Sequence, residues 1–229
     1  MTVKSKTQRM KKIAYALLAI LSLSFQSYSQ QSELGNWWIY FGNKKLNENW
    51  NIHHEVQYRN YNFVGDLEQL LLRGGVGYNL TENNNNLLLG YGFIRSENYI
   101  DTTDTKAVVN EHRIYQQFIT KQSFGRLSLS HRYRLEERFV EDVFKVRFRY
   151  FLTAKVALNK AKIEDNTFYL SAYNEIFVGT QNQFFDRNRV YGGLGYAVKP
   201  NLKFELGYMS QIFQGSCRDQ MNVICSFSF

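Results

Sequence analysis

Residues 126–157 read RLSLSHRYRLEERFVEDVFKVRFRYFLTAKVA, and this stretch decides the fold of the chain. Apolar and polar side chains alternate in two runs, which the acidic pair Glu141-Asp142 separates. Because successive side chains of a β-strand point to opposite faces, each run predicts a strand with one apolar and one strongly charged face. Arginine is rarely buried in a dry core. The charged faces therefore either meet bulk water, or line a wet, ion-paired barrel interior while the apolar faces meet lipid.

The N-terminus has the features of a signal peptide. Basic residues precede the apolar segment Ile13–Leu23, which is too short to cross a bilayer as a helix. Small residues at Ser27 and Ser29 predict cleavage before Gln30, which makes residues 1–29 the signal peptide and 30–229 the mature domain; an uncleaved anchor helix is the alternative. Cleavage removes five basic residues and no acidic one, so the formal net charge falls from +8 to +3. Nucleic acid is therefore not an expected partner.

The composition of the mature chain is typical of a strand-rich protein. The sequence contains 18 Phe, 16 Tyr and 3 Trp but a single Pro, and strands favour aromatic residues and exclude proline. The mean hydropathy of −0.41 does not exclude a membrane protein, because barrel strands carry apolar residues only at alternate positions. A chain of about 200 residues suits one domain.

The alternation recurs along the whole mature chain in about eleven runs, each of the length of a tilted transmembrane strand. No run has the period of a helix. Further polar segments separate the runs, at residues 47–49, 60–67, 81–86, 99–107, 122–125, 159–166, 180–186, 199–201 and 214–220. Since bacterial outer-membrane barrels have an even number of strands, we expect an all-β, antiparallel transmembrane β-barrel of 10 or 12 strands. Gly35–Leu46 is the least secure strand.

A soluble, exported β-sandwich or lipocalin-like barrel is the alternative fold. Its apolar faces would point inward and its arginines outward. The long strands, the Tyr and Trp residues near strand ends and the aromatic C-terminal segment Ser226–Phe229 favour the membrane barrel. We therefore expect a monomer in the outer membrane of a Gram-negative cell, with outer-membrane lipid and, during insertion, the barrel assembly machinery as partners.

If the apolar faces meet lipid, charged residues of both signs gather in the lumen. The candidate binding site is this charge cluster: Arg59, Arg73, Glu111, Arg113, Arg132, Arg134, Glu136, Arg147, Arg149, Glu175 and Arg189. The same faces carry Glu55, Lys145 and Glu205. Opposite charges on neighbouring strands attract, so Glu111, Glu136 and Glu175 are the expected mates of Arg132, Arg134, Arg147 and Arg149. This network predicts a largely filled lumen with a structural role or a role in small-solute binding or passage; an anion-selective pore is the second interpretation.

A lipid-modifying barrel enzyme, of the phospholipase or lipid A deacylase type, is the alternative function. Such enzymes need a serine and a histidine on the same side of the barrel wall. Ser128 and Ser130 alternate with His131 and point to the opposite face, and the neighbours His53 and His54 diverge in the same way. A pair within one strand is excluded, whereas a pair across two strands stays open. We predict no catalytic residue, no metal site and no cofactor.

The two cysteines leave a disulfide open. Export permits one, but Cys217 falls in the predicted loop 214–220 and Cys225 in the strand that follows. The two residues then lie far apart unless the loop folds back. Cys225 shares one face of this strand with Val223 and Phe227, which predicts that Cys225 faces lipid.

Several pieces of the sequence, taken in order, resemble the DUF2490 family of uncharacterised outer-membrane β-barrels, which is common in Bacteroidetes. The pieces are Lys44–Trp50, Gln57–Arg59, His131–Arg138, Arg147–Tyr150, Tyr169–Glu175, Asn188–Tyr196 and Leu206–Tyr208. The resemblance implies a fold and a location. It implies no activity and no catalytic residues.

Overall fold

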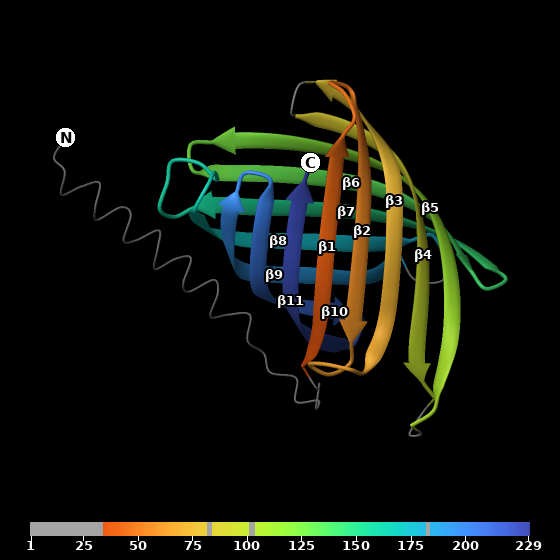
Figure 1. The fold of residues 1–229 in the computed structure, drawn as a ribbon. Coiled ribbons are helices and arrows are strands. Elements are labelled where there is room, and N and C mark those ends of the chain that lie inside the picture. The colour runs from red at the N-terminus through yellow and green to blue at the C-terminus, as the bar shows by residue number, and fades with distance from the viewer. Residues whose placement is uncertain (1–33, 82–83, 101–103, 182–183) are drawn as a thin grey trace. The chain divides into compact units, whose positions relative to one another are not determined.

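The alternating runs form strands in the computed structural model, which describes residues 34–81, 84–100, 104–181 and 184–229. The strands within these ranges number eleven: β1 (Gly35–Lys45), β2 (Trp50–Asn60), β3 (Leu67–Thr81), β4 (Asn85–Tyr99), β5 (Lys106–Phe124), β6 (Leu127–Val140), β7 (Val143–Ala157), β8 (Thr167–Gly179), β9 (Phe185–Lys199), β10 (Leu202–Phe213) and β11 (Ser216–Ser228). They form one continuous sheet that closes on itself as a barrel (Figure 1). Among these residues, no helix is long and apolar enough to span a membrane. The predicted signal peptide, 1–29, lies outside the described residues.

The barrel closes through a parallel pair of strands. Consecutive strands are antiparallel, but β1 runs parallel to β11, from Gly35 opposite Gln220 to Asn43 opposite Ser228. The prediction of 10 or 12 strands in a wholly antiparallel sheet is therefore wrong for the described chain. An up-and-down meander with an odd number of strands leaves its first and last strands pointing the same way, so only a parallel ladder can join them. The least secure strand of the prediction is the one that closes the barrel.

The last hairpin is tighter than the sequence suggests. Only Gln214 and Gly215 connect β10 to β11, and Gly215 has a φ of 87°, a backbone conformation open to glycine without steric cost. The predicted loop 214–220 is wrong beyond Gly215. Cys217 and Cys225 consequently lie in one strand, eight residues or roughly 26 Å apart, and both thiols are free. No disulfide joins them.

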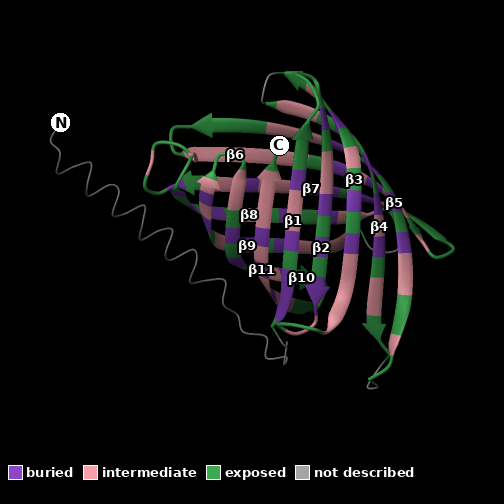
Figure 2. Ribbon diagram, viewed as in Figure 1, coloured by how far each residue is buried: buried purple, intermediate pink, exposed green. Residues whose placement is uncertain are grey.

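Burial alternates along the strands (Figure 2). Apolar side chains such as Trp38 and Leu206 are 46% and 55% exposed on the outer face, whereas Arg134 and Glu136 are buried on the inner face. The wall is thus apolar outside and charged inside, which confirms that the charged faces of residues 126–157 line the barrel interior. The inverse arrangement of a soluble barrel is not found in the described strands.

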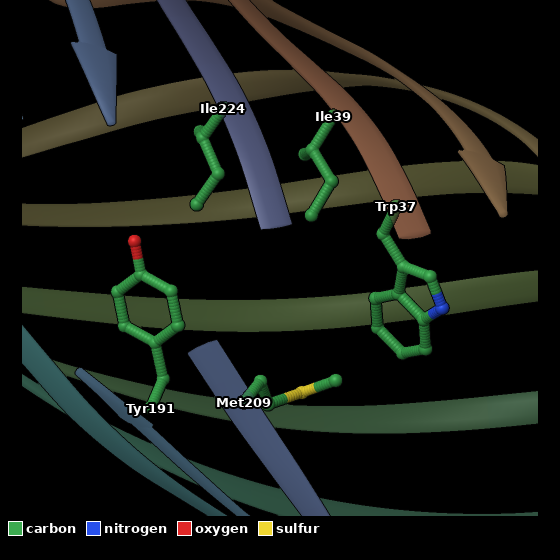
Figure 3. Packing of buried hydrophobic residues seen from close by; sticks show 5 residues of the cluster. All are labelled: Trp37, Ile39, Tyr191, Met209 and Ile224. Carbon is green, nitrogen blue, oxygen red and sulfur yellow. The ribbon is translucent and has the colours of Figure 1, made fainter. Parts of the chain in front are cut away.

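One part of the inner wall is apolar. Trp37 and Ile39 of β1, Tyr191 of β9, Met209 of β10 and Ile224 of β11 form a buried cluster (Figure 3). These strands are neighbours around the parallel closure. The lumen therefore has an apolar side as well as charged ones.

Glycines of the inner face make room for large lumen side chains. A Cβ at Gly90 would lie 2.2 Å from Cζ of Tyr115, and one at Gly195 would lie 2.2 Å from Cζ of Tyr169. Both tyrosines are fully buried. The glycines thus let the lumen fill with aromatic rings.

Candidate functional site

The register of the strands sets which lumen charges face each other. Glu55 lies opposite Arg73, and Glu136 lies opposite Arg147. Cross-strand pairs of opposite charge stabilise a sheet. Like charges also meet, since Arg134 lies opposite Arg149. Such a like-charged pair needs a carboxylate reached from a diagonal position.

Glu136 of β6 is the first of these carboxylates and is fully buried. Its Oε2 accepts hydrogen bonds from Nε and Nη2 of Arg147 at 3.0 and 2.6 Å, and its Oε1 accepts one from Nη1 of Arg149 at 2.5 Å. Guanidinium groups of Arg134 and Arg113 lie 3.5 and 4.0 Å away. One carboxylate therefore compensates part of the charge of four arginines.

Glu175 of β8 has the same role on the adjacent part of the wall. Its Oε1 accepts hydrogen bonds from Arg149 at 3.0 and 2.5 Å and from Arg132 at 2.7 Å. Nη1 of Arg189 lies 3.5 Å from Oε2. Arg149 thus bridges Glu136 and Glu175 and joins the two hubs.

Glu111 of β5 pairs with two arginines other than those expected. It accepts hydrogen bonds from Arg113 and from Arg138, the latter at 2.6 and 2.9 Å. Arg113 and Arg138 are directly opposite each other. Glu136 and Glu175 are thus the mates of Arg132, Arg134, Arg147 and Arg149, as predicted, whereas Glu111 is not.

Aromatic rings support the guanidinium groups. The ring centroid of Phe177 lies 4.5 Å from Cζ of Arg149 and 4.6 Å from Cζ of Arg189. Tyr115 lies 4.4 Å from Cζ of Arg134. Cation–π contacts gain strength where water is excluded, so these buried rings hold the arginine planes in place.

All eleven candidate residues face the lumen. Ten are buried, and Arg132 is half-buried. Glu55 and Glu205 are buried as well, but Lys145 is exposed near the start of β7. The sequence reasoning missed Arg138 and Arg187, although both follow the alternation of their strands, and the amides of Gln57, Gln117 and Gln211, which accept hydrogen bonds from arginines.

The charge network divides the lumen into two cavities. The larger has a volume of about 690 Å³ and opens toward the rim with Lys121, Lys155 and Lys203. The smaller, of about 200 Å³, lies toward the rim with Ser96, Asn98 and Arg138. Four arginines line both cavities and therefore form the partition between them: Arg59, Arg73, Arg149 and Arg189.

Both cavities have an excess of positive charge. Nine cationic and three acidic side chains are among the described residues of the larger cavity, a difference of +6. In the smaller one, eight arginines surround one glutamate, a difference of +7. A third hollow, of about 900 Å³, lies on the apolar outer face beside Trp50, Tyr78 and Phe118, and most of its lining residues are apolar.

Among the described residues, no histidine is hydrogen-bonded to a serine. His54 and His131 lie on the outer face, where they are hydrogen-bonded with the hydroxyls of Tyr40 and Tyr150 at 3.0 and 2.8 Å. Ser128 and Ser130 line the larger cavity instead. In the part of the chain that the structure describes, no group of three or more His, Cys, Asp or Glu residues could hold a metal ion.

Comparison with known proteins assigns a family. The DUF2490 family, described as a protein of unknown function, matches residues 34–222, which span every strand from β1 to the middle of β11. The chain belongs to this family. No curated protein and no solved structure matches it.

Proposed function

We propose that this DUF2490 chain is an outer-membrane β-barrel whose lumen binds or slowly passes small solutes and does not form an open channel. The observation that carries the proposal is the polarity of the wall, with apolar side chains exposed outside and an arginine–glutamate network buried inside. An apolar exterior suits hydrocarbon. In water it would expose far more apolar surface than soluble monomers do.

Aromatic pairs at both rims support the membrane location. Trp50 and Tyr78 lie at one rim with ring centroids 5.0 Å apart, and Phe139 and Phe144 lie at the other with centroids 5.2 Å apart. All four side chains are exposed on the outer face. Aromatic residues gather at the two interfaces of membrane-spanning barrels.

Export and assembly follow from the proposal. Residues 1–29 act as a cleaved signal peptide, the barrel assembly machinery inserts the mature chain, and the inserted barrel is a monomer surrounded by outer-membrane lipid. Expression of the full chain in a Gram-negative host tests this. We expect a mature N-terminus at Gln30, recovery in carbonate-washed outer membranes, and a band that migrates differently before and after boiling. Recovery in the soluble periplasm would overturn the proposal.

The partition predicts a closed lumen. Arg149, which hydrogen-bonds to two glutamates, and the three other arginines that line both cavities occupy the path of an ion. We expect no steady single-channel currents from purified barrel in planar bilayers at physiological salt. Steady currents would show an open pore and contradict the binding role.

A further inference from the structure

Arg59 differs from the other buried arginines of the lumen. It is 6% exposed, yet no carboxylate oxygen of the described residues lies within 4.0 Å of its guanidinium. Its hydrogen bonds go to neutral amides, at 3.0 and 2.5 Å to Gln57 and at 2.7 Å to Gln69. The nearby Glu68 pairs with Arg218, and Glu55 pairs with Arg73. A buried cation without a counter-ion is costly.

The surroundings of Arg59 add unsatisfied donors and positive charge. A nearby carboxylate oxygen without a hydrogen-bond partner, Oε2 of Glu68, belongs to a group that already pairs with Arg218. Its Cζ lies 3.7 Å from the ring centroid of Trp37, and Cζ of Arg189 lies 4.9 Å from the same ring. The indole Nε1 of Trp37 and Nε of Arg73 are buried without a hydrogen-bond partner. Since a guanidinium has five N–H donors and Arg59 uses three, two remain. The two free N–H groups of Arg59 and the unpaired donors of Trp37 and Arg73 therefore favour an anionic acceptor at this position.

The larger cavity continues from Arg59 along an apolar wall. Ile39 and Phe41 of β1 and Ile224 of β11 line it, and Ile39 lies opposite Ile224 across the parallel pair (Figure 3). The volume of about 690 Å³ is in the range of sites for organic ligands. An inorganic anion would leave this wall without contacts.

We propose that the larger cavity binds a small organic anion, whose carboxylate or phosphate group is held by Arg59 and whose aryl or alkyl body lies against Ile39, Phe41 and Ile224. This inference rests on the proposed solute binding in the lumen and specifies its substrate class. Lys121 and Lys203 line the same cavity, and no ion pair of either is found among the described residues. They attract anions toward the mouth.

Trp37 provides the reporter for a direct test. It is the only tryptophan in the lumen, because Trp38 and Trp50 are exposed on the outer face. The variant Trp38→Phe/Trp50→Phe, folded into phosphatidylcholine vesicles, therefore reports on the indole that contacts Arg59. Three probes are titrated while its emission is recorded: phenylacetate, inorganic phosphate as the anion alone, and 2-phenylethanol as the body alone.

We expect a saturable emission change with phenylacetate and at least tenfold weaker binding of the other two probes. Arg59→Gln in the same background should weaken phenylacetate at least tenfold, whereas Arg95→Gln, a change on the outer face near one rim, should have no effect. If phosphate bound as tightly as phenylacetate, the proposed contact between the ligand body and the apolar wall would be wrong. If 2-phenylethanol bound as tightly, the proposed need for an anionic group would be wrong. An unchanged affinity in Arg59→Gln would overturn the assignment of Arg59.

The failure of this inference is distinguishable from failure of the proposed function. Each variant is first tested for heat-dependent migration, which reports a folded barrel. If the barrel is folded, membrane-inserted and non-conducting but does not bind phenylacetate, only the proposed organic-anion site is wrong. If the chain is recovered in the soluble periplasm, the proposed membrane barrel is wrong.

Discussion

Glu136 is the residue on which most of the lumen charges converge. Four arginine side chains lie within 4.0 Å of its carboxylate, and none of its surface is exposed. Three of them have further carboxylate partners: Arg147 pairs with Asp186, Arg149 with Glu175 and Arg113 with Glu111. Arg134 has no second carboxylate partner among the described residues and otherwise contacts the amide of Gln117 and the ring of Tyr115. Loss of the negative charge at position 136 should therefore weaken the ion pairs of several strands and destabilise the barrel.

Glu136→Gln should destabilise the folded barrel by about 3 kcal/mol, because breaking a buried ion pair leaves an uncompensated charge. The measurement is a denaturant titration of the protein in phospholipid vesicles. Glu137→Gln is the matched control, since Glu137 is the next residue of β6 and points to the other face. Equal midpoints for the two variants would mean that Glu136 does not hold the network.

At the scale of elements, the closure between β1 and β11 is the feature most open to test. Tyr40 lies opposite Cys225 in the parallel register, and both side chains point outward. Paired residues of adjacent strands are close enough for a disulfide. Tyr40→Cys should thus form one with Cys225 under mild oxidation.

The readout of this disulfide is a mobility shift on a non-reducing gel in a Cys217→Ser background. Ile39→Cys is the control, because its side chain points into the lumen and cannot reach the outward thiol. Absence of a bond in a folded Tyr40→Cys barrel would argue against the parallel closure.

The sequence predicted the faces of the strands better than their number. Alternation in residues such as Arg147, Phe148 and Arg149 depends on local geometry alone, so the inner and outer faces follow directly. The strand count depends on how the first and last strands meet, which no local pattern encodes. The partners of Glu111 likewise depend on a register between β5 and β6 that a sequence does not fix.

The apolar part of the lumen shows a second limit of the pattern. Trp37 and Ile39 alternate with Trp38 and Tyr40, so both faces of β1 are apolar and alternation cannot tell inside from outside. Arg59 could be predicted to face the lumen, but its lack of a carboxylate partner depends on which side chains the neighbouring strands bring to its level.

At the scale of the whole molecule, the outer face separates a membrane barrel from a soluble one. Leu206, in the middle of β10, and Leu80, next to the end of β3, are 55% and 51% exposed. In a bilayer, Leu206→Arg should cost about 2–4 kcal/mol and Leu80→Arg about 0–1 kcal/mol, because the cost of a charge depends on depth. Folding titrations in vesicles measure both. Equal, small effects would indicate that water surrounds both positions.

The parallel closure also fixes the rims at which the first strand begins and the last strand finishes. β1 begins at the rim opposite to the one at which β11 finishes, so a linker joining the two ends would have to run the length of a strand, roughly 35 Å for eleven residues. Circular permutation with a short linker is thereby ruled out. In a membrane-inserted barrel, an epitope placed just before Gly35 and one placed after Phe229 would face different compartments, and a protease added to intact cells would remove only one of them.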